Sequence, residues 1–170
     1  MATESFQNDL QLAEKLLYNE CGFQLQNFVW NPESTNYGAC SFELNNYKIQ
    51  FRVANITPTK IGQFVAIWKR NNHGITAPFD VADSLDFLII SARDSGNSGQ
   101  FIFPKSVLVA KGIVSQNEKG GKRGIRVYAP WDKPENKQAL KTQDWQVNYF
   151  VEIKENLPVD VELVKRIFSI

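Results

Sequence analysis

The strongest constraint on the fold is an alternating segment in the first third of the chain. Residues 41–54 read SFELNNYKIQFRVA, and Asn45-Asn46 separates two runs in which apolar and polar side chains alternate. Because asparagine tolerates positive φ angles, this pair predicts a tight hairpin turn with Leu44 opposite Tyr47. The period of two predicts an antiparallel sheet with one apolar face. That face carries Phe42, Leu44, Tyr47, Ile49, Phe51 and Val53.

Other segments predict helices before and after this hairpin. Apolar residues at helical spacing predict a helix over residues 6–19. Thr57-Pro58 is typical of a helix start, so residues 57–70 are expected to form a second helix, in which Gly62 is unfavourable. Further helical segments are expected at residues 106–110, 134–153 and 159–167.

Short apolar runs bounded by turn residues predict the remaining strands. They lie at residues 23–30, 86–91 and 100–104. The 170 residues contain no repeat and no linker, so a single domain over residues 1–170 is expected. The order of the elements predicts an α/β (α+β) fold, a mixed β-sheet flanked by helices.

Charge is distributed unevenly along the chain. Residues 48–126 hold twelve basic and five acidic side chains, whereas residues 1–47 hold one and six. A basic middle segment suggests an anionic partner, provided that its cations cluster on one face. The alternative is that the cations are scattered over a solvated surface.

The first residues of the chain and its two cysteines predict the cellular compartment of the protein. Residues 1–9 carry two acids and no base, and no apolar run approaches the ~20 residues of a membrane span. Cys21 and Cys40 lack the spacing of a zinc or redox motif and are expected to be reduced thiols. A cytoplasmic protein without a membrane partner is expected.

The chain has no complete catalytic motif. Its one histidine, His73, lies in an Asn/Gly-rich turn and is interpreted as a turn residue rather than a general base. A Mg²⁺ site needs carboxylates, and Glu43 with Asp80 or Asp86 offers the available set. No spacing forces these side chains together, so a loop-capping role is favoured for the aspartates. No cofactor is expected unless the protein is a Mg²⁺-dependent nuclease.

The polar side of the predicted hairpin suggests a more specific hypothesis. Gln50 and Arg52 point the same way, and Lys60, Gln63 and Arg70 follow in the next segment. A Gln-x-Arg strand resembles the Glu-x-Lys strand of the restriction-endonuclease-like, PD-(D/E)xK, fold, whose acid binds metal. Gln50 is a weak metal ligand and Arg52 is a poor base, which favours phosphate binding over hydrolysis.

A second basic cluster lies in KGGKRGIRVYAPW, residues 119–131. Its glycines allow backbone amides to approach an anion. Its cations include Lys122, Arg123 and Arg126, and Tyr128 and Trp131 are suited to stacking on bases. The alternative is a mobile charged loop followed by core aromatics. Lys105, after Phe103-Pro104, either adds to this surface or is simply solvated.

Several stretches taken together are similar to the MepB-like family. They are ACSFELNNYKIQFRVANITPTKIGQFVAIWKR, DFLII, GQFIFPKSVL, KGGKRGIRVYAPW and KTQDWQ, within residues 39–146. The resemblance implies a bacterial cytoplasmic protein with a nuclease-like fold, and it implies no established reaction.

Three functions are therefore open. The first is binding of DNA or RNA on a degenerate nuclease-like scaffold, with cations on phosphates and Gln50 and Gln63 donating hydrogen bonds. The second is a Mg²⁺-dependent nuclease, and the third is a protein-interaction or small-ligand module. The first hypothesis gains most if Arg52 and Arg126 border one groove.

Overall fold

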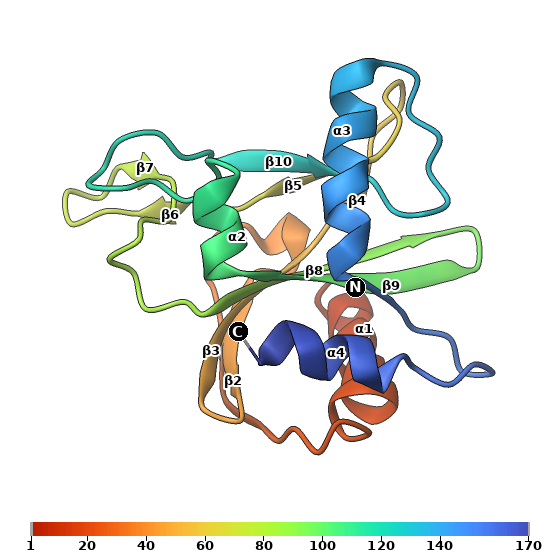
Figure 1. Ribbon diagram of the computed structural model, residues 1–170. Helices are drawn as coiled ribbons and strands as arrows, with labels where there is room; N and C mark the ends of the chain where they lie inside the picture. The colour runs from red at the N-terminus through yellow and green to blue at the C-terminus, as the bar shows by residue number, and fades with distance from the viewer. Residues whose placement is uncertain (1, 170) are drawn as a thin grey trace.

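The computed structural model describes residues 2–169, which fold around a six-stranded sheet (Figure 1). The helices are α1 (Ala2–Ala13), α2 (Lys105–Ala110), α3 (Lys137–Gln146) and α4 (Val161–Phe168), and other helical turns lie at Glu14–Tyr18, Thr35–Tyr37 and Val147–Tyr149. The strands are β1 (Leu25–Trp30), β2 (Cys40–Leu44), β3 (Tyr47–Val53), β4 (Asn55–Ile56), β5 (Gln63–Ala66), β6 (Lys69–Arg70), β7 (Thr76–Ala77), β8 (Phe87–Asp94), β9 (Asn97–Pro104), β10 (Gly124–Val127) and β11 (Phe150–Glu152). The predicted mixed sheet flanked by helices is confirmed.

The hairpin predicted from the alternating segment forms strands β2 and β3 of this sheet. Leu44 pairs with Tyr47, and Asn45 and Asn46 have φ angles of 48° and 71°, as the predicted turn requires. The strand order is β1-β2-β3-β8-β9-β11. Only the β3–β8 pair is parallel, because the chain leaves β3 and returns to β8 through a long crossover.

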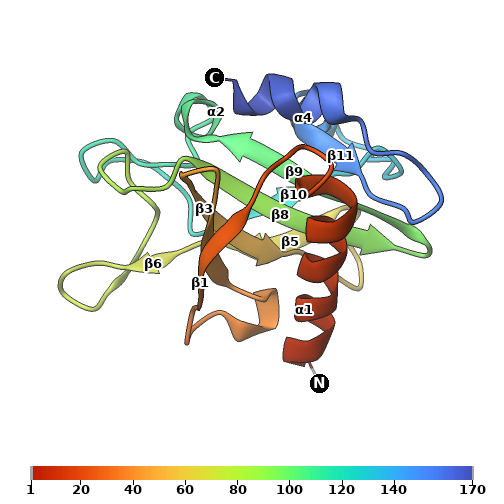
Figure 2. The same cartoon turned by 90° about the horizontal axis from the view of Figure 1, so that it is seen from below.

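The two faces of the sheet are covered differently (Figures 1 and 2). Helices α1 and α4 cover the apolar hairpin face, where Phe42 and Ile49 join a core with Leu17 and Phe168. A three-stranded sheet of order β10-β5-β4, together with α2, covers the other face. The end of the polar hairpin side, Arg52 and Ala54, is therefore enclosed between two sheets, whereas Glu43, Lys48 and Gln50 stay at least partly exposed.

The helix expected over residues 57–70 is not formed. Gly62 has a φ of +82°, which an α-helix excludes, and the residues after it form strand β5. Gln63 pairs with Val127 of β10 and with Ile56 of β4, so neighbouring strands satisfy its backbone. Cross-strand pairing, which is formed only in the tertiary structure, outweighs the local Thr-Pro signal.

The helix expected over residues 134–153 is shorter than predicted. Helix α3 ends at Gln146, and Phe150 to Glu152 form the edge strand β11 against β9. The β-branched and aromatic residues at 147–151 favour this extended pairing. Helices α2 and α4 confirm the predictions for residues 106–110 and 159–167 within one or two residues. No helix within residues 2–169 has the length and apolar composition needed to cross a bilayer.

Candidate functional site

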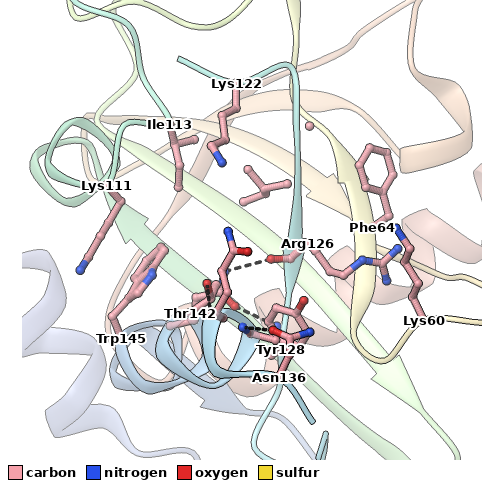
Figure 3. A pocket seen from close by; sticks show the side chains of 15 residues that line it. Lys60, Phe64, Lys111, Ile113, Lys122, Arg126, Tyr128, Asn136, Thr142 and Trp145 are labelled. Carbon is pink, nitrogen blue, oxygen red and sulfur yellow. Dashed lines mark hydrogen bonds between the residues drawn. The ribbon is translucent and has the colours of Figure 1, made fainter. Parts of the chain in front are cut away.

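An open cleft of about 460 Å³ lies between the three-stranded sheet, α3 and the segment after α2 (Figure 3). Strand β10 forms one wall of the cleft. Its side chains point alternately to opposite faces of the three-stranded sheet. Ile125 and Val127 are buried, whereas Arg126 and Tyr128 are partly exposed. Arg126 and Tyr128 line the cleft, and buried Ile125 also contributes to its lining. The short alternation in GIRVY thus aims one cation and one aromatic ring at the same space.

Arg126 fixes the neighbouring loop as well as lining the cleft. Its Nη1 atom donates to the Thr57 hydroxyl at 3.1 Å and lies 3.2 Å from the Gly62 carbonyl oxygen and 3.3 Å from that of Ile61. These contacts hold residues 57–62 against β10, which places Lys60 at the edge of the cleft. The Nη1 atom of the guanidinium therefore stabilises the loop, and the positive charge of Arg126 remains beside the cleft.

Gln146 attaches helix α3 to the edge of β10. Its side-chain oxygen accepts a hydrogen bond of 2.8 Å from the Tyr128 N–H, and its side-chain nitrogen donates one of 3.1 Å to the Arg126 carbonyl. The side chain is only 1% exposed. The amide acts like a neighbouring strand, so α3 and β10 form two connected walls.

The rim of the cleft is basic. Lys60, Lys111 and Lys122 are exposed and come from three separate segments, and Arg126 adds a fourth cation. In the described part of the chain, none of these four takes part in an ion pair. No aspartate or glutamate is among the described residues that line the cleft. Uncompensated cations at a concave surface create a positive potential that attracts anions.

Three aromatic rings lie among these cations. Phe64, Tyr128 and Trp145 are partly exposed and line the cleft. The Lys111 ammonium lies 5.3 Å from the centroid of the Trp145 ring, a cation–π contact. Figure 3 shows Lys111 and Trp145 at the left of the view, and Lys60, Phe64 and Arg126 at the right. Cationic and apolar surfaces are thus available within one pocket.

The structure brings together only part of the predicted site. Residues of both basic clusters line one cleft: Lys60 comes from the first cluster, and Lys122, Arg126 and Tyr128 come from the second. Four of the other predicted cations and donors are engaged elsewhere. They are Arg70, ion-paired with Glu33 at 2.7 Å; Arg123, on the Thr76 carbonyl; Lys105, on the Asp83 carbonyl; and Gln63, on the Arg93 carbonyl.

Gln50 and Trp131 lie in other pockets. Gln50 lines a polar hollow of about 340 Å³ together with Glu43, Lys48 and Ser41 of the hairpin. Trp131 packs edge-on against Phe150, with ring centroids 5.4 Å apart. Neither residue contributes to the cleft beside β10.

Arg52 is enclosed between the two sheets and does not border a groove. Its side chain is 0% exposed, and its Nη1 donates to its neighbour's carbonyl at Phe51. Within the described residues, Nε and Nη2 have no hydrogen-bond partner, and the guanidinium carbon lies 6.0 Å from the Phe79 ring centroid. Burial lowers the pKa of Arg52 to about 10, so it stays charged at neutral pH. Arg52 and Arg126 therefore do not border one groove, and the condition under which the nucleic-acid hypothesis would gain most is not met.

The carboxylates considered for Mg²⁺ are each engaged in hydrogen bonds with other protein groups. Hydrogen bonds from Asn27 and then Lys48 lower the pKa of Glu43. Asp86 accepts a bond of 2.8 Å from the Lys48 N–H, and Asp80 accepts bonds from the loop at 115–118. Within residues 2–169 there is no group of three or more His, Cys, Asp or Glu side chains arranged to hold a metal ion.

Sequence reasoning missed several residues of the cleft. Lys111, Phe64, Trp145 and Gln146 were not among the predicted site residues, and polar side chains of α3, Asn136, Gln138 and Thr142, also line it. Phe64 lies in the segment 57–70, which was expected to form a helix that is not formed. The KTQDWQ stretch, recognised for its family resemblance, contains three of the missed residues, Thr142, Trp145 and Gln146.

Comparison with known proteins places the cleft inside a region that a family model matches. The model of the MepB-like family matches residues 31–152, which include the residues lining the cleft. A solved structure described as the crystal structure of MepB is 32% identical, with a TM-score of 0.74. The alignment covers 85% of this chain and 98% of that chain. No curated protein matches the chain.

Proposed function

The chain belongs to the MepB-like family, and we propose that it binds nucleic acid through the cleft between β10 and α3. One observation carries the proposal. Four cations from segments distant in sequence, Lys60, Lys111, Lys122 and Arg126, meet at one cleft without forming ion pairs in the described chain. By contrast, the cations in the ion pairs described for the fold, such as Lys69 and Arg93, lie elsewhere.

The chemistry of the cleft suits a phosphate backbone with bases. Lysine and arginine neutralise phosphates and release condensed counterions, which gives affinity that falls steeply with salt. Partly exposed aromatic rings add stacking on bases, which does not require a particular sequence. The combination of rim cations and Phe64, Tyr128 and Trp145 therefore favours nucleic acid over a simple inorganic anion.

Fluorescence anisotropy with labelled DNA and RNA strands tests the proposal. We expect binding at micromolar protein that weakens as salt rises, with a slope set by the number of neutralised phosphates. Lys122→Ala should reduce the magnitude of the salt slope by about 1, the change expected for one lost phosphate contact. Lys119→Ala is the matched control, because Lys119 is exposed in the same loop but does not line the cleft.

Two results would contradict the proposal. The first is the absence of salt-sensitive binding by any strand, single or double. The second is an equal loss for Lys119→Ala and Lys122→Ala, which would indicate diffuse attraction to the loop rather than a site. Mass spectrometry of molecules that co-purify with the protein separates nucleic acid from a protein partner or a small anionic ligand.

We also propose two further properties that the sequence predicts: residual hydrolysis and a cytoplasmic location. A nuclease-like scaffold with residual hydrolysis predicts cleavage of DNA or RNA in Mg²⁺ or Mn²⁺ that is lost in Glu43→Ala. The free thiols of Cys21 and Cys40 support a cytoplasmic location. Binding at the cleft depends on neither expectation.

A further inference from the structure

We infer that the cleft takes a single strand, with one unstacked base inserted among its aromatic rings. This inference rests on the proposed function and specifies the form of nucleic acid. It starts from a difference in exposure between two kinds of side chain. Lys60, Lys111 and Lys122 are exposed, whereas the aromatic rings of Phe64, Tyr128 and Trp145, which line the same cleft, are only partly exposed.

Such an arrangement separates the two parts of a nucleotide. The exposed cations are accessible to phosphates, and a group that enters the cleft meets the partly exposed rings that line it. A duplex shows base edges in its grooves and keeps the base faces stacked inside. Only an unstacked base offers its face to a ring, which is how proteins bind single-stranded DNA and RNA.

Tyr128 is the ring best placed for an incoming base. The Phe64 ring lies so close to Gly124 that a Cβ there would be 2.5 Å from it, and Trp145 is occupied by Lys111 and Phe103. Tyr128 contacts Gly62 along one edge and has no aromatic partner among the described residues. We therefore assign Tyr128 as the main stacking surface.

Polar groups beside this ring can contact the edge of the base. Asn136 uses its side-chain oxygen to cap α3 by accepting from the Ala139 N–H at 2.8 Å, which leaves its NH₂ group for a ligand. Gln138 is exposed, and its side chain makes no hydrogen bond within the described chain. These amides donate and accept, so they suit base edges rather than phosphates alone.

The cleft continues past Tyr128 along the surface. A neighbouring hollow of about 350 Å³ shares Lys60, Arg126, Tyr128 and Asn136 with it and extends toward Pro134 and Glu135, the one acidic side chain among the described residues that line it. The two hollows form one groove that is longer than a single nucleotide pocket. A strand can follow this groove while one base occupies the deeper part.

The test compares three labelled ligands by anisotropy with the full-length protein. They are a decathymidylate strand, an abasic strand of the same length, and the decathymidylate paired with its complement. Stacking of one base should make the thymidylate strand bind roughly fivefold or more tightly than the abasic strand, which has the same phosphates. The duplex should bind more weakly than the single strand.

Variants locate the effect on the ring. Tyr128→Leu keeps an apolar contact to Gly62 and should lower affinity for the thymidylate strand roughly fivefold or more, with little change for the abasic strand. Tyr128→Phe keeps the ring and should retain most of the preference. Phe28→Ala is the control, because Phe28 is an exposed aromatic on β1, outside the cleft. Circular dichroism melts verify that each variant is folded.

The outcomes separate this inference from the proposed function. Equal, salt-sensitive binding of the abasic and thymidylate strands would overturn base insertion and leave phosphate binding in place. Tighter binding of the duplex would do the same. Thymidine monophosphate that competes as well as the strand would overturn the strand as the ligand. Failure of every ligand to bind would overturn both proposals.

Discussion

The carboxylate of Asp80 accepts a 2.7 Å hydrogen bond from the hydroxyl of Ser115, a residue 35 positions later in the chain. It also accepts bonds from the N–H groups of Ala82, at 2.9 Å, and Glu118, at 3.0 Å. These bonds, the one from Ala82 foremost, lower the pKa of Asp80 to about 2. Asp80 thus holds the start of the loop that presents Lys122 to the cleft.

The first prediction concerns the pH dependence of this contact. The pKa of Asp80 falls from its ordinary value of 3.8 to about 2 on folding, so its ionised form stabilises the fold above about pH 4. That contribution is lost as pH falls through about 2. Asp80→Asn should therefore unfold at lower urea than the wild type at neutral pH, and the difference should shrink at acidic pH. A difference that grows on acidification would contradict the assignment.

The second prediction concerns the backbone beside Tyr128. Gly62 has a φ of +82°, and a Cβ there would lie 2.7 Å from the Tyr128 ring and 2.8 Å from the Val127 carbonyl oxygen. Gly62→Ala should therefore lower the free energy of unfolding by roughly 2–4 kcal/mol, because strain and a clash add. Gly74→Ala is the matched control, with a φ of +73° and no atom near its added Cβ. It should cost only about 1 kcal/mol, and equal losses in the two variants would contradict the close contact.

The third prediction concerns the buried charge of Arg52. Nε and Nη2 of Arg52 have no partner in the described chain. An apolar side chain of similar length should therefore stabilise the fold at least as much as Arg52 does. Arg52→Met should leave the free energy of unfolding unchanged or raise it, by up to roughly 4 kcal/mol. Arg52→Ala should lower it by roughly 2–5 kcal/mol through the cavity it leaves. Urea denaturation measures both, and a large loss in Arg52→Met would reveal a polar partner that Arg52 needs.

The fourth prediction concerns the link between α3 and β10. Gln146→Leu keeps the side-chain volume but leaves the Tyr128 N–H and the Arg126 carbonyl without their partner. Each unsatisfied buried group costs about 1–3 kcal/mol, so a loss of roughly 2–6 kcal/mol is expected for the two groups in thermal or urea unfolding. Gln138→Leu, on the exposed side of the same helix, should change stability little. Similar losses in both variants would indicate a general effect on α3 instead.

Local pattern alone predicted the parts of the fold in which neighbours in sequence decide the structure. The hairpin around Asn45-Asn46 has the predicted register, because alternation and turn chemistry act over a few residues. The short helix α2 and the terminal helix α4 were predicted for the same reason. Residues 57–70 were predicted wrongly, since the Thr-Pro signal competes with pairing to β10, which lies some sixty positions later.

The candidate site divides in the same way. From the sequence came a basic middle segment, the cluster around Arg126 and the resemblance to the MepB-like family. Which cations share a surface was decided only by the tertiary structure. The second sheet encloses Arg52, and the β5–β10 pairing brings Lys60 beside Arg126. A residue's type determines the charge it can carry, whereas burial and long-range pairing determine whether that charge meets a ligand or the interior of the fold.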